Sequence, residues 1–477
     1  MAPKAFVLAD SEDGLLDRLD PGINTVPYLL TLNAVIQSSF NLRSKKVPAA
    51  LQPDGRIWAR ILDFTSSFDK YQIRYVPGEM RQLMDLTIHI GRCLGDMAQV
   101  VIFPLQAAMH RIDDTVGTFT SLHLDYVRLI HETGMYSEAL SIVSQPIHSF
   151  PPLPLKAADR EFGADGRTFW SNFASSRDYI LQTGLSDKIK PADVYEYFLL
   201  AGMVYLALED YKNASLNFEH VITAPNIGSP HVFMLEAYQK WLLCQCLANG
   251  HSPAAPSTTN STALKHLQNA AKPYTALASI FKSGDRARLF AEIDVGQSVW
   301  TNDGNWGLVD QLARHLDRFH ILNLQKCYSA LPLSFVAHGL NRSSSDTKRF
   351  IEMLISTNQL NAETQMPPNT SASEPVLRLY PETRISGPLA RTELQQLEAL
   401  KAQTGRTEKI AGFVRAANLR ASVTKEYLQF EAKAKKDEAS GRGGPSNMAD
   451  VLPGGGPPMD GFGHAVDDDD EDLMADG

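Results

Sequence analysis

The sequence predicts a mainly α-helical protein, in which a solenoid of helical repeats leads into a small domain of helices and strands, followed by further helices and a disordered tail. Three observations predict this order. Pairs of amphipathic helices recur through the middle of the chain, and the apolar spacing changes from a helical to a strand-like period near residue 358. The last stretch of the chain is poor in large apolar residues.

The clearest helix pair lies between Phe198 and Pro225. Apolar residues recur at i, i+3, i+4 and i+7 along each predicted helix, which places them on one face. Glycine inside a helix costs roughly 1 kcal/mol relative to alanine, so Gly202 predicts a close approach by the backbone of the partner helix. The residues expected to pack the pair together are Phe198, Gly202, Tyr205, Ala214 and Phe218.

This order of aromatic, glycine, tyrosine, alanine, phenylalanine and proline is similar to the tetratricopeptide (TPR) repeat. A single pair cannot bury its own apolar face, so neighbouring pairs are expected to stack against it. Two further pairs are predicted at 122–147 and 232–281, the second interrupted by Pro273. Because these units differ in sequence, they predict a TPR-like right-handed solenoid of irregular members.

The composition is that of a globular chain, and its net charge of −9 is concentrated partly in the acidic run Asp467–Asp472. No apolar run approaches the roughly 20 residues that cross a bilayer, and the N-terminus lacks the pattern of a signal peptide. Four cysteines in 477 residues do not make a disulfide framework, so Cys244 and Cys246 are interpreted as buried, inert thiols in a reducing compartment. No membrane partner, metal or other cofactor is predicted.

The pattern between Trp306 and Tyr380 predicts a winged helix. A long helix from Trp306, a short helix at 333–340 and a third helix capped by Ser345 or Asp346 precede two strands, QLNAETQ and EPVLRLYP. The residues expected on the buried face of the third helix are Phe350, Met353 and Leu354.

A winged helix can place its third helix in the major groove of DNA. Here that helix offers only Lys348 and Arg349 beside Glu352, and the loop MPPNTSASE between the strands carries no Lys or Arg. No basic stripe stands out elsewhere in the sequence, so protein packing is favoured over nucleic-acid binding.

Helical repeats that run directly into a winged helix resemble the PCI family, whose members are subunits of the proteasome lid, the COP nine signalosome and a translation initiation factor. Segments from LHLDYVRLIHETGMYSEAL to FIEMLISTNQLNAETQ are similar, in order, to a PCI subunit of the signalosome over roughly residues 122–380. The most specific part runs from LAGMVY to MLEAYQKWLL. The Pro-rich stretch 145–166 and the long wing loop depart from the family pattern.

The predicted organisation has four parts. They are N-terminal helical repeats at 1–193; a PCI domain at 194–383, with helical repeats at 194–318 and the winged helix at 319–383; C-terminal bundle helices at 387–436; and a disordered Gly/Pro-rich acidic tail at 437–477. The tail has too few large apolar residues to offset the entropy lost on ordering.

The resemblance implies that the winged helices of neighbouring subunits pair edge to edge and that their C-terminal helices gather in one bundle. The residues expected on the pairing edge are Val376, Leu377 and Leu379. The residues expected in the bundle are Leu394, Leu397, Leu400, Ile410, Val414, Ala417, Ala421 and Leu428. Together with Thr424, those after Gly405 follow alternating spacings of four and three residues, as in a bundle seam. The alternative is a helix that folds back on the chain's own body.

The resemblance also implies a non-catalytic scaffold of the cytoplasm and nucleus, in a complex that removes the modifier Nedd8 from cullins and so acts on cullin-RING ligases indirectly. The implied partners are the other PCI and metalloprotease subunits; the alternative is a PCI scaffold of the proteasome lid or of an initiation factor. The sequence agrees, since it has no His-x-Glu-x-x-His, no phosphate-binding Gly-rich loop before a helix and no Gly-x-Ser-x-Gly turn.

Overall fold

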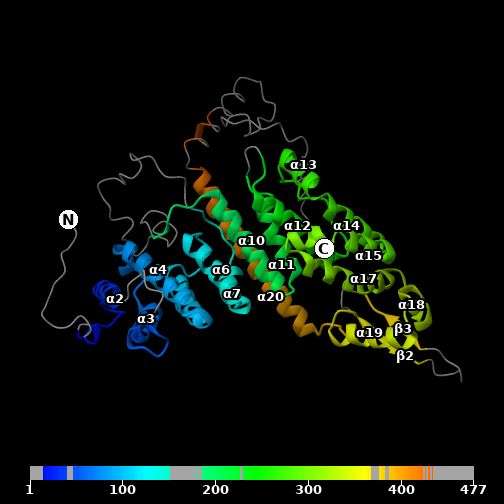
Figure 1. Ribbon diagram of the computed structural model, residues 1–477, viewed down its shortest axis with the longest axis horizontal. Coiled ribbons are helices and arrows are strands. Elements are labelled where there is room, and N and C mark those ends of the chain that lie inside the picture. Colours follow the sequence, from blue (N-terminus) through cyan, green and yellow to red (C-terminus); the bar gives the residue numbers. More distant parts are fainter. Residues whose placement is uncertain are drawn as a thin grey trace, which may run out of the picture. The chain divides into compact units, whose positions relative to one another are not determined.

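The computed structural model describes residues 14, 16–39, 47–150, 180, 185–225, 229–366, 375–381, 386–422, 425, 428, 429 and 432. The chain divides into two compact units, Met1–Leu389 and Ala390–Gly477 (Figure 1). The predicted tail, most of the Pro-rich stretch 145–166 and the wing loop lie outside the described residues.

The first unit is mostly helical, which confirms the predicted fold class. Its N-terminal part consists of α2 (Thr25–Ser39), α3 (Arg56–Ser67), α4 (Pro77–Leu94) and α5 (Ile102–Ile112), with the short 3-10 helices η1 (Ala49–Leu51), η2 (Gln72–Tyr75) and η3 (Gly95–Val101). One apolar core runs through these helices and the repeats that follow, from Leu16 to Phe319. The predicted boundary between 193 and 194 falls inside this core and stays a prediction.

The predicted helix pairs form at the expected places. The first pair is α6 (Ser121–Thr133) and α7 (Tyr136–Val143), and the second is α10 (Pro191–Ala207) and α11 (Tyr211–Ile222). In the turn of the first pair, Gly134 has φ of 71°, a left-handed conformation that glycine adopts without steric cost.

The third repeat has more helices than the sequence indicated. α12 (Val232–Asn249) is followed by α13 (Ser261–Ala270), α14 (Lys272–Ser283), α15 (Arg286–Val295) and α16 (Gln297–Asn302). Pro273 lies in the first turn of α14, where its missing N–H is not needed, so the predicted interruption is the start of a new helix.

Gly202 lies where α10 and α11 touch. A Cβ atom at this position would stand 2.5 Å from Cε1 of the Phe218 ring, well inside the usual separation of about 3.5–4 Å between carbon atoms. The close neighbour is therefore an aromatic side chain and not the partner backbone. Ala214 and Phe218 are fully buried and Tyr205 nearly so, whereas Phe198 is only partly buried and lies against His220, with ring centroids 4.9 Å apart.

The winged helix has its own smaller core. It consists of α17 (Trp306–Cys327), β1 (Ala330–Pro332), α18 (Leu333–Leu340), α19 (Ser344–Ser356), β2 (Ala362–Gln365) and β3 (Val376–Leu379). The first half of α17 packs into the repeat core, and Ile321 in its second half belongs to the winged-helix core (Figure 1).

Two predicted details of α19 are wrong. Ser343, and not Ser345 or Asp346, caps the helix, because its hydroxyl accepts a hydrogen bond from the Asp346 amide at 3.1 Å. Met353 is 50% exposed and Phe350 only partly buried. The side chains that α19 buries are Thr347, Ile351 and Leu354, which follow i, i+4, i+7 spacing, so of the predicted face Leu354 is confirmed as buried.

His123 forms part of the N-terminal cap of α6 and is almost completely buried. Its Nε2 donates to the Val116 carbonyl at 3.1 Å, and its Nδ1 accepts from the Thr120 amide at 3.2 Å. Burial disfavours the imidazolium and lowers the pKa of His123 to about 4. The neutral ring is therefore part of the folded structure.

This burial predicts a loss of stability in mild acid. Since the folded pKa lies below the unfolded value of about 6.5, the unfolded chain binds more protons between pH 6.5 and 4, and the stabilisation present above pH 6.5 is lost as pH falls. We expect His123 to contribute a loss of about 2 kcal/mol between pH 7.5 and 5. Urea unfolding of His123→Gln, whose amide can keep both hydrogen bonds, should show a smaller drop; equal drops would contradict the assignment.

A buried polar network ties α12 and α14 to the turn before α17. Lys240 donates to Oδ1 of Asn305 at 3.0 Å, and Nδ2 of Asn305 donates to the Tyr274 hydroxyl at 2.8 Å. That hydroxyl donates to Asp303 at 2.7 Å. Because Asn305 is fully enclosed and Lys240 is 5% exposed, these partners replace water that the core excludes.

Candidate assembly interface

The sheet of the winged helix places β3 in its centre, which corrects the prediction that Val376, Leu377 and Leu379 form a free edge. The strand order is β1-β3-β2, and β3 pairs antiparallel with both neighbours. Leu377 and Leu379 are core residues. The prediction failed because β1 has only three residues and ends in Pro332, so it carries no alternating pattern by which a strand could be recognised.

The free edges of the described sheet belong to β1 and β2. In an antiparallel pair, alternate residues direct their N–H and C=O groups toward and away from the partner. The hydrogen bond from the Leu379 amide to the Ser329 carbonyl, at 2.8 Å, sets this phase for β1. Ala330 and Pro332 therefore direct their backbone groups outward, and proline has no N–H to donate.

The edge of β2 is better suited to pairing. The Tyr380 amide donates to the Asn361 carbonyl at 2.9 Å, so Ala362 and Thr364 direct their backbone groups away from β3. Ala362 is fully buried, whereas Thr364 is partly exposed. The accessible part of the edge is therefore the end of β2 that leads to the wing loop.

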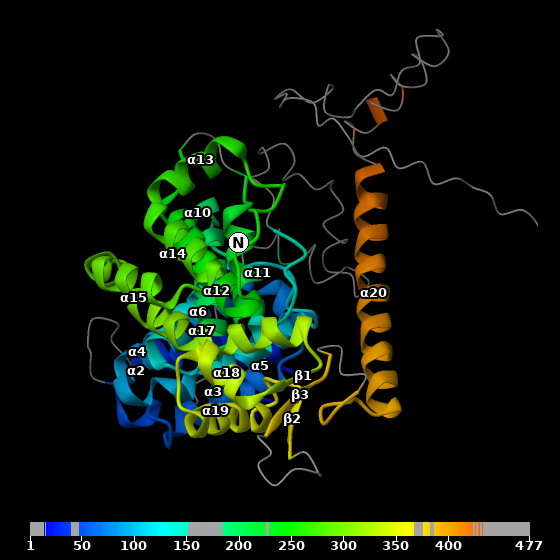
Figure 2. The same ribbon diagram turned by 90° about the vertical axis from the view of Figure 1, so that its right-hand side faces the viewer.

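The described part of the second unit contains one helix of 30 residues, α20 (Glu393–Ser422). It runs through Gly405 without a break, as Figure 2 shows, so the bundle segments predicted before and after this glycine are one straight helix. Every predicted bundle residue whose side chain is described is exposed, and the exposed fraction of the leucines runs from 47% at Leu397 to 65% at Leu394. The Ala421 side chain lies outside the described part.

Continuity through Gly405 separates the apolar residues of α20 into two stripes. Successive residues of an α-helix are rotated by about 100°, so Leu394, Leu397 and Leu400 centre on a direction roughly 130° from the stripe that begins at Ile410. Within α20 the second stripe contains Ile410, Val414 and Ala417, and Leu419 returns to the side of the first. The membership of Ala421 and Leu428 in this stripe stays a prediction. The helix thus presents two apolar faces, which point in different directions and lie at different positions along its length. The spacing within each stripe can be recognised in the sequence. The angle between the two stripes around the helix axis cannot, because it depends on whether Gly405 breaks the helix.

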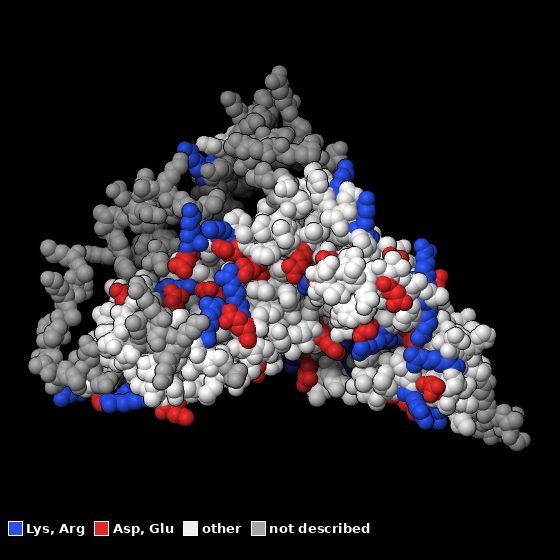
Figure 3. Space-filling view, in the orientation of Figure 1, with Lys and Arg blue, Asp and Glu red and all other residues white. Residues whose placement is uncertain are grey.

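The charges of the first unit do not form a nucleic-acid surface in the view of Figure 3, where Lys and Arg alternate with Asp and Glu. On α19, Lys348 lies 3.8 Å from Glu352, and Arg349 lies 3.9 Å from Asp346. Carboxylates beside these cations weaken their attraction for phosphates. The surface therefore gives no support to DNA binding by α19.

Cys244 and Cys246 are fully buried on α12. Burial raises the pKa of the Cys246 thiol to about 12 and that of Cys244 also far above its ordinary value, so neither forms a thiolate at neutral pH. Within the part of the chain that the structure describes, no three His, Cys, Asp or Glu side chains gather so as to hold a metal ion.

Relatives identify the chain. COP9 signalosome complex subunit 3 of Emericella nidulans is 30% identical over 469 residues, which cover 98% of this chain and 90% of the relative. The chain belongs to the COP9 signalosome subunit 3 family. The subunit 3 of Neurospora crassa is 24% identical over 91% of this chain and 84% of its own length, and that of Drosophila melanogaster is 30% identical over 35% and 37%.

The subunit 3 family also matches at the level of its repeats. The family described as "COP9 signalosome complex subunit 3, N-terminal helical repeats" matches residues 179–263, which include α10, α11 and α12. This range contains the helix pair around Gly202 on which the repeat prediction depended.

None of the described helices is both long and apolar enough to cross a membrane.

Proposed function

We propose that this subunit 3 family member is a scaffold subunit of the COP9 signalosome. The observation that carries the proposal is α20, a helix of 30 residues with two exposed apolar faces. A lone helix of this kind gains little stability by itself in water and gains most by packing against other helices. The full-length similarity to subunit 3 proteins supports the signalosome as the complex in which those helices occur.

The two apolar faces of α20 indicate that at least two neighbouring helices pack against it. A single helix packed beside α20 covers one side, so stripes about 130° apart require a neighbour for each. The stripe from Ile410 contains Ala417, whose small side chain allows close approach of the neighbouring backbone, whereas the leucine stripe keeps its neighbour further away. We expect α20 to occupy an interior or corner position in a helical bundle and the β2 edge to extend into a neighbouring winged helix.

The role of the subunit is to hold other subunits and not to cleave a bond. The complex would remove Nedd8 from cullins through its metalloprotease subunit, and the present chain would support it in the cytoplasm and nucleus. The sequence contains no His-x-Glu-x-x-His motif with which to activate water on zinc. Contact with cullin-RING ligases would then be indirect.

Affinity purification of the tagged full-length chain from native extract tests the proposal. We expect the other PCI and metalloprotease subunits to co-purify, and we expect the eluate to remove Nedd8 from a cullin conjugate. The same chain purified alone with zinc present should have no such activity. Co-purification of proteasome base subunits or of ribosomal initiation components would contradict the proposal, and cleavage by the isolated chain would contradict the non-catalytic role.

A further inference from the structure

We infer that Asp317 is a positioning residue that fixes the orientation of the winged helix relative to the helical repeats. Asp317 lies on α17, the helix that both cores share, and only 5% of it is exposed. Its Oδ1 accepts from Nη1 of Arg286 at 2.6 Å, and its Oδ2 accepts from Nη2 of Arg342 at 2.5 Å. The structure thus joins three separate segments at one carboxylate.

The two arginines come from different sides of the junction. Arg286 is the first residue of α15, in the repeats, and its guanidinium lies over the Phe290 ring at 5.5 Å. Arg342 lies between α18 and α19, in the winged helix, and its guanidinium lies over the Phe350 ring at 4.9 Å. Stacking on a ring restricts each guanidinium, so each side of Asp317 has a fixed partner.

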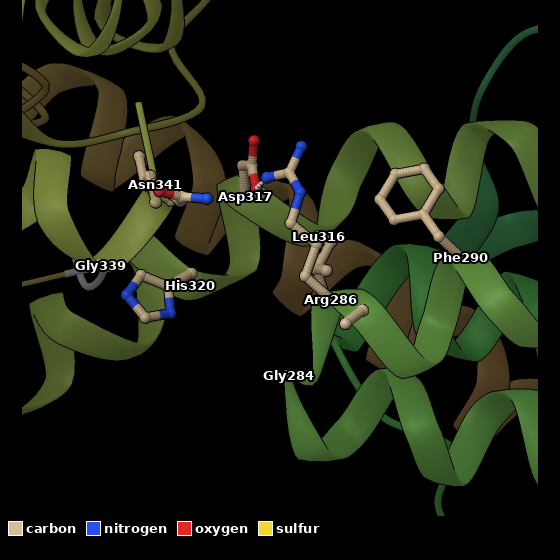
Figure 4. A pocket seen from close by; sticks show the side chains of 10 residues that line it. Gly284, Arg286, Phe290, Leu316, Asp317, His320, Gly339 and Asn341 are labelled. Carbon is tan, nitrogen blue, oxygen red and sulfur yellow. Dashed lines mark hydrogen bonds and ion pairs between the residues drawn. The ribbon is translucent and has the colours of Figure 1, made fainter. Parts of the chain in front are cut away.

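Apolar packing alone gives only a weak connection between the helical repeats and the winged helix, whose meeting point on α17 is called the junction here. The repeat core and the winged-helix core are separate, and among the described residues Leu322 is the one that packs against both. A cavity of about 400 Å³ lies between α15, α17 and α18, lined by Arg286, Asp317, His320 and Asn341. Figure 4 shows Arg286 reaching Asp317 at this cavity, so this ion pair joins α15 to α17 beside a region that side chains do not fill.

A second close contact, with α18, lies on the same side of α17, because His320 follows Asp317 by three residues and lines the same cavity. At Gly339 on α18, a Cβ atom would stand 2.9 Å from Nε2 of His320, so the two helices approach closely where glycine allows it. The tight contact acts as a pivot, and Asp317, one turn earlier on α17, prevents rotation about it. The winged helix then presents its β2 edge in one direction. The fixed orientation is argued from the contacts of Asp317, and only its use in assembly rests on the proposed function.

The distance between two spin labels on the isolated full-length chain tests the orientation directly. Labels would be attached at Ser279→Cys on α14 and Met353→Cys on α19, both exposed, in a background in which the accessible Cys93 and Cys327 are serine. The native junction should give one narrow distance distribution. Asp317→Asn keeps the side-chain volume but removes the charge that holds both arginines, and we expect the width of the distribution at least to double.

Two further variants decide the interpretation. Arg342→Gln removes only the bond to the winged helix, and because its side chain is 34% exposed the variant should fold even if Asp317→Asn does not. It should broaden the distribution similarly, with an unchanged circular dichroism spectrum. Asp310→Asn makes the same chemical change on the same helix, where Asp310 pairs only with Arg314 among the described residues, and should leave the distribution narrow. A narrow distribution in Arg342→Gln, or a broad one in Asp310→Asn, would overturn the inference.

Discussion

A chain truncated after Pro388 is expected to lose its incorporation into the signalosome while its first unit remains folded. The truncation removes α20, whose exposed leucines alone can supply the contact energy: burying two leucine side chains stabilises by about 3 kcal/mol, which corresponds to an affinity change of roughly 100-fold. The two apolar cores described for the first unit contain no residue of α20. Size-exclusion chromatography with partner subunits, and circular dichroism of the chain alone, measure the two effects.

Truncation after Lys436 is the matched control and should incorporate normally, because it keeps both stripes and removes only the acidic tail. Normal incorporation of the chain ending at Pro388 would mean that α20 is not the assembly contact and would favour a helix that folds back on its own body.

Replacing Leu397 and Leu400 by glutamine should weaken the binding of one neighbouring subunit. Replacing Ile410 and Val414 by glutamine should weaken the binding of another. If both pairs of substitutions release the same neighbour, the two stripes do not serve separate contacts.

The second large effect is expected at Gly202. In Gly202→Leu the new side chain would occupy the space of the Phe218 ring, and we expect a loss of about 1–3 kcal/mol in the free energy of unfolding. The strain falls on the α10–α11 pair, which lies inside the continuous repeat core, so it should lower the thermal midpoint of the first unit as a whole.

Gly307→Ala provides the control, since a Cβ atom at this position of α17 has no atom within 4 Å and should leave the midpoint unchanged or slightly raised. A smaller side chain at position 218 should relieve the clash with a side chain at position 202. We therefore expect Phe218→Leu to lower the free energy of unfolding by less in the Gly202→Ala background than in the unmodified chain. An unchanged midpoint for Gly202→Leu, or strictly additive effects of the pair, would show that the ring does not block this space.

The helix pairs were predictable because apolar residues at helical spacing record which face is buried, and the repeats are built from such local units. Gly202 was correctly associated with a close approach, but spacing alone could not distinguish an aromatic ring from a backbone. The winged-helix sheet was only half predictable, since β1 is short and its partner strand lies more than forty residues away, as the pairing of Leu331 with Leu377 illustrates.

The candidate site shows the same limit. The apolar residues of α20 were identified from the sequence, whereas the separation into two faces required knowledge that the helix continues through Gly405. Asp317 was not recognised, because a single carboxylate on a predicted helix face gives no indication of the two arginines that reach it. Such contacts depend on tertiary distance and leave no local pattern. The assembly roles of these residues stay predictions.

The network of Lys240, Tyr274, Asp303 and Asn305 also restricts how this sequence can diverge. Asn305 and Tyr274 are bonded to each other and to the two charged residues, so an apolar replacement of one of this pair leaves a buried polar group of the other with one partner fewer, which costs free energy. A lineage that alters this site must therefore pass through less stable intermediates or change several positions together. Even among relatives that keep about 30% of their residues, we expect these four positions to be inherited as a set.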